Sequence, residues 1–374
     1  MKKRGIYMIS AAALTALFHL LAPHRPLMTA VASFTLCIRQ ALARFFSPLP
    51  FSAAEALICA ALLFLFIYII CALVSFVRGC GRRRRILLGR LSFLIAAAET
   101  VYLLLCLFLG ASYYAESFQA KSGLRPAPST VGELYAVTDY FAGKLGETYM
   151  LVPRDENGLF AASLDGIFAS APDIYRGAEE EYAFLALKDV PPKRVLFSRL
   201  MSRFNYTGFY FPFTGEANIN TDAPACLIPS TIAHEMAHQR GVASEQDANF
   251  CAVLACTLSG DPVYEYSGWL MGYIHLCSAL YGYDRDGYRE ICSSLPEPVL
   301  ADLRANNAYW KAFETRSAEI SGRIYDAFLK SYGQELGVHS YGAVVDLLIA
   351  RYLPVLRTGE AQNVPGEGLS SASQ

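Results

Sequence analysis

Residues 232–241 read Ile-Ala-His-Glu-Met-Ala-His-Gln-Arg-Gly, and they contain the HExxH pattern over 234–238. On a helix, side chains four positions apart lie on the same face, so His234 and His238 can point at one metal ion. Glu235 follows His234 directly and can take a proton from a water molecule that a zinc ion activates. The stretch therefore predicts a zinc-binding helix of a hydrolase. The alternative is a pair of histidines that serve as ordinary polar residues of a helix.

The residues on either side of the motif predict a short helix. Ser230 is a suitable N-cap residue, and a helix over 231–240 is expected to follow it. Gly241 stands where a helix commonly ends in a left-handed residue. We therefore expect the metal helix to end soon after His238 and the chain to turn back at once.

A second helix is predicted to start at Glu245 and to supply the third ligand. Ser244 can cap this helix, with Asp247 forming part of a capping box. In gluzincin-type peptidases the third zinc ligand is a glutamate on a second helix, and a polar residue four positions later orients a ligand histidine. Glu245 and Asn249 have this spacing. The sequence thus predicts one Zn²⁺ held by two histidines and Glu245, with a fourth position open to water.

Two other residues are alternative ligands. Asp247 is close enough in sequence to replace Glu245, and it otherwise belongs beside the site as a capping residue. His275 can also bind a metal, although a lone histidine in an apolar helix is more often a packed core residue. A metzincin site is excluded, because that pattern requires a histidine where this chain has Ser244.

The chain is too apolar for an ordinary soluble protein, and the excess of apolar residues is concentrated before residue 112. Hydrophobic residues make up 54% of the 374 residues, and charged residues make up 17%. Three apolar stretches, at about 5–22, 54–77 and 91–111, are each near the ~20 residues that cross a bilayer. We therefore expect a membrane domain over 1–111 with three transmembrane helices. The first stretch has an alternative interpretation as a cleaved signal peptide.

Basic residues predict the orientation of these helices. They precede the first stretch and fill the loop between the second and third: Lys2, Lys3, Arg4, Arg78, Arg82, Arg83, Arg84, Arg85 and Arg90. The positive-inside rule puts both clusters in the cytoplasm, so the rest of the chain is expected outside a bacterial cytoplasmic membrane. Residues 24–53 carry arginines and two prolines among apolar residues, and we expect an interfacial helix and a turn on the outer side.

The remaining residues divide into a linker, a domain and a tail. Residues 112–130 are polar and contain prolines, 131–358 show mainly helical periodicity, and 359–374 are rich in Gly and Ser and expected to be disordered. The expected fold is mainly α, with three transmembrane helices followed by a helical, zincin-like domain. The net charge of −1 argues against nucleic acid as a partner.

A short extended segment is expected just before the metal helix. Residues 211–220 lie where zincins place the edge strand that pairs with an extended peptide. Substrate contacts are expected from Gly215, Glu216, Ala217 and Asn218. A purely structural turn is the alternative.

Two residues near the C-terminus are candidates for catalysis. His339 and Tyr341 lie in a glycine-flanked loop before the last predicted helix. Either side chain can donate a hydrogen bond to the oxyanion of a tetrahedral intermediate. Ordinary packing of a C-terminal loop is the alternative for both.

The chain resembles a bacterial family of membrane-anchored proteins, the domain-of-unknown-function 3810 (DUF3810) family. The resemblance is carried by residues 211–220, 232–241, 245–250, 325–334, 338–342 and 344–349. It covers most of the chain, and it implies a gluzincin-like fold and zinc metallopeptidase activity without naming a substrate. One departure is Asp247, where the family is expected to have glutamate.

The function expected from these patterns is hydrolysis of peptide bonds outside the cytoplasmic membrane. The partners are then a peptide or protein substrate and membrane lipid. Glu235 is the expected general base, and it also returns the proton to the leaving amine. The alternative is a zinc-binding transmembrane sensor without peptidase activity. Proteolysis within the membrane is disfavoured, because the motif lies inside no apolar stretch of about 20 residues.

Overall fold

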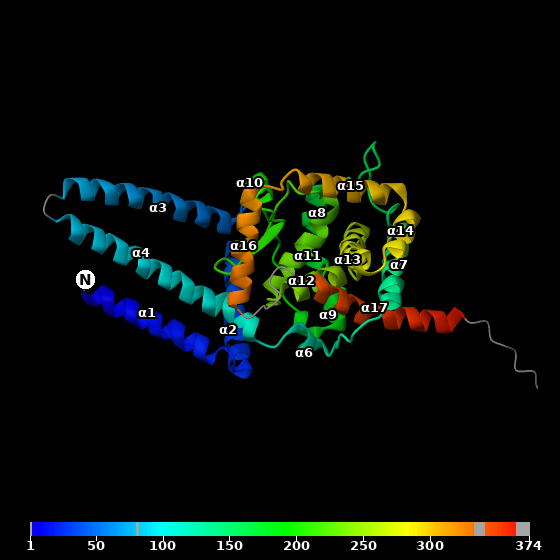
Figure 1. Cartoon of the computed structure of the whole chain (residues 1–374), viewed down its shortest axis with the longest axis horizontal. Helices are drawn as coiled ribbons and strands as arrows, with labels where there is room; N and C mark the ends of the chain where they lie inside the picture. Colours follow the sequence, from blue (N-terminus) through cyan, green and yellow to red (C-terminus); the bar gives the residue numbers. More distant parts are fainter. Residues whose placement is uncertain (1, 80–81, 333–340, 364–374) are drawn as a thin grey trace, which may run out of the picture.

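The computed structural model describes residues 2–79, 82–332 and 341–363, and these residues are mainly helical. Long N-terminal helices extend to one side of a globular helical domain (Figure 1). This arrangement agrees with the expected mainly α class. The disordered tail predicted for 359–374 is wrong at its start, because residues 359–363 belong to helix α17 (Tyr341–Asn363). The rest of the predicted tail lies outside the described residues.

Four N-terminal helices are long and apolar enough to cross a membrane. They are α1 (Lys2–Leu21), α2 (Arg25–Phe46), α3 (Ala53–Arg78) and α4 (Arg83–Leu105), and α4 continues through a π-helical turn (Cys106–Gly110) into α5 (Ala111–Tyr114). α4 packs against both α1 and α3, so these three run side by side (Figure 1). The sequence predicted three spans at nearly these positions, and α2 is the additional candidate.

α2 differs from the other three in direction and in which residues it buries. It crosses the ends of α1, α3 and α4 next to the globular domain (Figure 1). It buries polar Thr35 and Arg39 against the protein, whereas apolar Leu27, Phe34 and Phe45 are exposed. An apolar side that faces away from the protein on such a helix is typical of one lying in the membrane interface. The sequence predicted an interfacial helix and a turn for residues 24–53, and the structure has helix α2 and a turn there.

Both basic clusters lie at the same end of the helical bundle. The Arg4 guanidinium donates a hydrogen bond to the Gly89 carbonyl at 2.7 Å, so the N-terminus lies beside the start of α4. This end is opposite the globular domain (Figure 1). The two basic clusters can therefore lie on one side of a membrane and the domain on the other.

Within the described residues, the globular domain contains one small sheet of three strands. They are β1 (Lys193–Arg194), β2 (Gly208–Phe211) and β3 (Glu216–Ile219), in the order β1-β3-β2. β3 runs parallel to β1 and antiparallel to β2. The prediction of an edge strand over 211–220 is therefore wrong, because its main strand, β3, is the buried centre of the sheet and β2 is an edge.

Buried polar groups of β3 hold the first turn of the membrane helix α3. The Glu216 carboxylate accepts hydrogen bonds from the N–H groups of Ala53 at 3.2 Å and Ala54 at 2.8 Å. The Ser52 hydroxyl donates to the Asn218 side-chain oxygen at 2.6 Å. The first N–H groups of a helix lack intrahelical acceptors and carry partial positive charge. A carboxylate at this end supplies the acceptor oxygens and a negative charge. α3 thus begins directly on the sheet.

The other helices form the body of the domain. They are α6 (Phe118–Ser122), α7 (Val131–Thr148), α8 (Leu164–Ser170), α9 (Arg176–Glu181), α10 (Ser198–Arg203), α11 (Ile228–Gln239), α12 (Glu245–Thr257), α13 (Pro262–Tyr283), α14 (Arg285–Ser294), α15 (Glu297–Lys311), α16 (Arg316–Ser331) and α17. Short 3₁₀ turns lie at Ala171–Asp173, Ala183–Leu185 and Ala225–Leu227. α13 packs against α7, α11, α12 and α17, so it is the centre of the core.

We expect Glu216→Gln to destabilise the protein. The glutamine keeps one acceptor oxygen but loses the charge that faces the first turn of α3, and its amide NH₂ group would face a backbone N–H donor of Ala53 or Ala54. The expected loss is about 2 kcal/mol, seen as a drop of a few degrees in the thermal midpoint of the full chain in detergent. Glu319→Gln is the matched control, because Glu319 is exposed. Equal midpoints for the two variants would contradict the capping role.

Candidate metal centre

The HExxH helix, α11, begins earlier than predicted and ends as predicted. It starts at Ile228, with Pro229 in its first turn, and the Ser230 hydroxyl donates to the Leu227 carbonyl. The predicted N-cap at Ser230 is therefore wrong, because proline is tolerated in the first turn, where its missing N–H has no partner to lose. Gly241 has a φ of +83°, which confirms the predicted left-handed residue after the helix.

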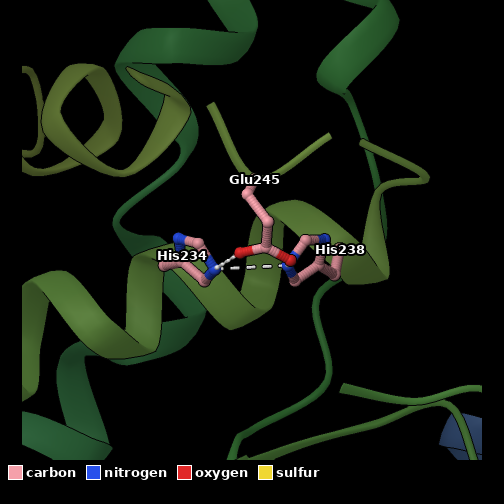
Figure 2. A group of neighbouring side chains, drawn as sticks. All are labelled: His234, His238 and Glu245. Atoms are coloured by element: carbon pink, nitrogen blue, oxygen red, sulfur yellow. Dashed lines mark hydrogen bonds and ion pairs between the residues drawn. The ribbon is translucent and has the colours of Figure 1, made fainter. Parts of the chain in front are cut away.

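The second ligand helix, α12, begins at Glu245 as predicted. Ser244 precedes it in an extended conformation, but its side chain makes no capping hydrogen bond. The predicted capping box is therefore not formed. Because Glu245 is the first residue of α12, its carboxylate lies close to the turn that joins the two helices, and it faces α11 (Figure 2).

Three ligand atoms from α11 and α12 converge on one point (Figure 2). The Nε2 atoms of His234 and His238 lie 3.2 Å apart. The Glu245 carboxylate lies 3.3 Å from Nε2 of His234 and 3.6 Å from Nε2 of His238. Two nitrogen ligands of a tetrahedral zinc ion, each about 2.0–2.1 Å from the metal, are about 3.3–3.4 Å apart. These spacings fit zinc, so the three residues can hold this ion.

Hydrogen bonding fixes the orientation of the second histidine. Nδ1 of His238 lies 2.7 Å from the Val242 carbonyl, which can only accept a hydrogen bond. Nδ1 therefore carries the proton, and the lone pair of Nε2 faces the other ligands. Asn249 lines the same cavity beside His234 and helps to favour the protonated form of that ring. Asn249 thus lies beside a ligand histidine, at the position where the sequence predicts a residue that orients one.

The charges of the three ligand side chains favour a positive charge between them. Burial opposes the charged form of His234, but the hydrogen bond and charge of Glu245 raise the pKa of His234 to about 9. Burial also acts to raise the pKa of Glu245, yet His234 and His238 lower it to about 2. Burial lowers the pKa of His238. The centre of the group therefore attracts a cation, whether a proton or a metal ion.

Glu235 is buried beside the metal ligands, and it contacts strand β2. Burial, reinforced by the charge of Glu245, raises the pKa of Glu235 to about 8, while His234 opposes this shift. A methyl group at Gly208 would lie 2.7 Å from Oε1 of Glu235. Only glycine lets the strand pass so close to this carboxylate. Oε2 of Glu235 is buried and has no hydrogen-bond partner in the described part of the chain.

Tyr325 belongs to the site, but the sequence did not predict it as a site residue. Its hydroxyl donates to Oε1 of Glu245 at 2.5 Å from helix α16. The residue entered the sequence analysis only as part of a stretch that resembles the family. It is 80 residues away from Glu245 along the chain, so no local spacing connects the two side chains.

The two alternative ligands lie apart from the metal-binding group. Asp247 is buried, accepts a hydrogen bond from the Phe118 N–H at 3.4 Å, and has a pKa that burial raises to about 6. It therefore holds the start of α6 rather than the metal. His275 lines the same cavity, but it is not one of the three converging ligands, and burial lowers its pKa to about 4.

The four predicted substrate contacts do not line the cavity. A methyl group at Gly215 would meet the Arg39 carbonyl of α2 at 2.2 Å, and Ala217 is fully buried. Glu216 and Asn218 bond to the start of α3 instead. Their side chains are thus occupied by the membrane helices, because β3 lies in the middle of the sheet. His339 lies outside the described residues, and Tyr341 opens α17 without a described side chain, so both remain predictions.

The three ligands open into a cavity of about 700 Å³. Its walls come from α11, α12, α13, α15 and α16, from residues 204–210, and from Leu109 and Tyr113 at the end of the membrane domain. Strand β2, rather than β3, therefore borders the space beside the metal ligands.

The fold and the site define a class: a helical domain attached to apolar helices, in which two histidines and one glutamate converge at a spacing that suits a metal ion. The family model of DUF3810, described as a protein of unknown function, matches residues 32–349. Since the match covers most of the chain, the protein belongs to the DUF3810 family. No curated protein and no solved structure matches the chain.

We expect Glu245→Gln and Asp247→Asn to differ in zinc content. The wild type and Asp247→Asn should each hold about one zinc ion per full-length chain, because Asp247 lies away from the ligands. Glu245→Gln should bind zinc more than about 100-fold more weakly, because the amide carries no charge. Metal analysis after dialysis, with circular dichroism to verify folding, measures this. Equal zinc loss in both folded variants would refute the assignment of Glu245.

Proposed function

We propose that the protein is a membrane-anchored, zinc-dependent metallopeptidase with Glu235 as its general base. The observation that carries the proposal is the convergence of His234, His238 and Glu245 on one point beside a buried, unpaired carboxylate oxygen of Glu235. A zinc ion bound there supplies Lewis acidity, which activates water and polarises a carbonyl. Hydrolysis of a carbonyl compound is a reaction that uses both a Lewis acid and a carboxylate base.

The roles of the side chains follow from their positions. Glu235 takes a proton from the attacking water on Oε2 and delivers it to the leaving amine. The Val242 carbonyl keeps the His238 imidazole in its orientation, and Asn249 lies beside His234 in the cavity wall. Tyr325, which bonds to Glu245, is close enough to the centre to contact a substrate that enters the cavity.

Strand β2 supports binding of an extended peptide. The Thr207 carbonyl accepts from the Asn220 N–H, and Gly208 pairs with Ile219. In an antiparallel ladder the bonded pairs alternate, so the main-chain groups of Gly208 and Tyr210 point away from β3. No strand in the described residues pairs with that edge. A substrate strand added there would pass beside Glu235.

The positions of the basic clusters support an orientation in a bacterial cytoplasmic membrane. Both clusters lie at the end of the helical bundle opposite the domain. With the N-terminus in the cytoplasm, as the positive-inside rule predicts, the metal centre lies outside it.

We expect Glu235→Gln to abolish hydrolysis while zinc stays bound. Glutamine has nearly the same shape but cannot accept the proton, so cleavage of fluorogenic casein should fall about 10²–10⁴-fold. Glu180→Gln, an exposed position on α9, is the matched control. Cleavage that persists in a zinc-loaded Glu235→Gln protein would refute the proposal. A zinc-binding sensor would then be the better interpretation.

We also expect Gly208→Ala to reduce cleavage without removing zinc. The added methyl group would collide with Oε1 and Cγ of Glu235, so the carboxylate must move. The variant should retain full zinc content and lose about tenfold or more of the rate. Gly146→Ala is the control, because a methyl group there meets nothing within 4 Å. An unchanged rate in Gly208→Ala would show that the position of Glu235 is not critical.

A further inference from the structure

We propose that residues 196–204 contact the lipid headgroups, and that the metal cavity takes its substrate there, from a polypeptide segment held at the bilayer surface. The substrate part rests on the proposed function, whereas the lipid contact does not.

Large apolar side chains on this segment are exposed although they lie on a folded helix. The exposed fractions are 83% for Leu196, 51% for Phe197, 50% for Leu200 and 39% for Phe204. Phe197, Leu200 and Phe204 follow helical spacing, so they share one side of α10 and its flanks. Clusters of this kind on a protein surface mark contacts with a partner or a membrane.

The position of the cluster beside α3 identifies the membrane as its partner. The Glu55 carboxylate on α3 accepts hydrogen bonds from the N–H groups of Leu196 and Phe197, both at 2.8 Å. Exposed Leu57 and Ile58 follow two and three residues later, a rise of about 3–5 Å along the helix. The cluster is therefore continuous with the lipid-facing surface of α3.

The charges near the cluster fit lipid headgroups. Arg199 and Arg203 on α10 are exposed beside the apolar side chains. Arginine next to exposed leucine and phenylalanine is typical of segments that lie in the interface of anionic membranes. A second copy of the chain would have to cover the cluster without displacing the bilayer from the neighbouring α3.

The same segment leads directly into the wall of the metal cavity. Phe204 belongs to the exposed cluster and also lines the cavity, and residues 205–210 continue that wall to Glu235. Across the cavity, Tyr325 and Phe328 of α16 and Leu109 of the extension of α4 line the wall, and α16 also exposes Ile320 and Ile324 outside it. Helix α16 lies at the junction of the domain and the membrane helices (Figure 1). The cavity is thus bordered by the elements closest to the bilayer.

Lipid contact is tested by fluorescence of Phe197→Trp in the full chain, reconstituted in bilayers with lipids brominated near the headgroup. Tyr283→Trp is the matched control, since Tyr283 is 77% exposed and ends α13 just before α14, and α14 lies on the side of the domain away from the N-terminal helices (Figure 1). After subtraction of the parent protein, which has two tryptophans, bromine should quench the emission at position 197 but not at 283. Equal quenching at both positions would overturn the proposal. So would emission at 197 that changes only with protein concentration, which indicates a second copy.

The substrate part is tested with one peptide sequence presented either free or attached to a lipid. The double variant Leu196→Asn, Leu200→Asn should lower cleavage of the lipid-attached peptide about fivefold and leave the rate on the free peptide within about twofold. Equal effects on both peptides would overturn the substrate inference. If bromine quenches the emission at position 197 but neither peptide is cleaved, the proposed function is refuted and the proposed lipid contact is supported.

Discussion

The site depends on one tight turn between two helices. α11 ends at Gln239, and Gly241 adopts a left-handed conformation, so α12 can begin at Glu245 and bring its first residue back against His234 and His238. A side chain at Gly241 would be strained and would press on Leu36 of α2. The same turn therefore sets the distance between the metal ligands and the contact between the domain and the crossing helix α2.

The membrane helices are part of the wall around the site rather than a simple tether. Arg39 on α2 is buried, lies over the Tyr210 ring at 5.7 Å, and donates to the Ser112 hydroxyl at 3.3 Å. A second cluster joins Phe18 of α1 and Met28 of α2 to Tyr332, just after α16. The helix that carries Tyr325 is thus fixed to the membrane part on one side and reaches the metal ligands on the other.

Local patterns predicted the three side chains that converge, and little of their surroundings. His234, His238 and Glu245 are related by helix geometry and one turn, both of which a sequence spacing encodes. No short sequence spacing encodes the order of strands in a sheet. Glu216 and Asn218 were therefore predicted to contact substrate, whereas in the structure they bind the start of α3. Tyr325 comes from a distant helix, and its approach depends on packing that no short spacing determines. A helix at the position of α2 was predicted, because arginines interrupt an apolar stretch there.

The hydrogen bonds between Glu216 and the start of α3 also determine how far the candidate metal ligands lie from the bilayer. Because the sheet holds the first turn of a membrane helix, and the HExxH helix packs on the sheet, the metal ligands cannot rise or sink relative to the bilayer independently of α3. Under the proposed function, a catalytic group held in this way would cut a bond at a set distance from the membrane, and the side chains next to that bond would matter less.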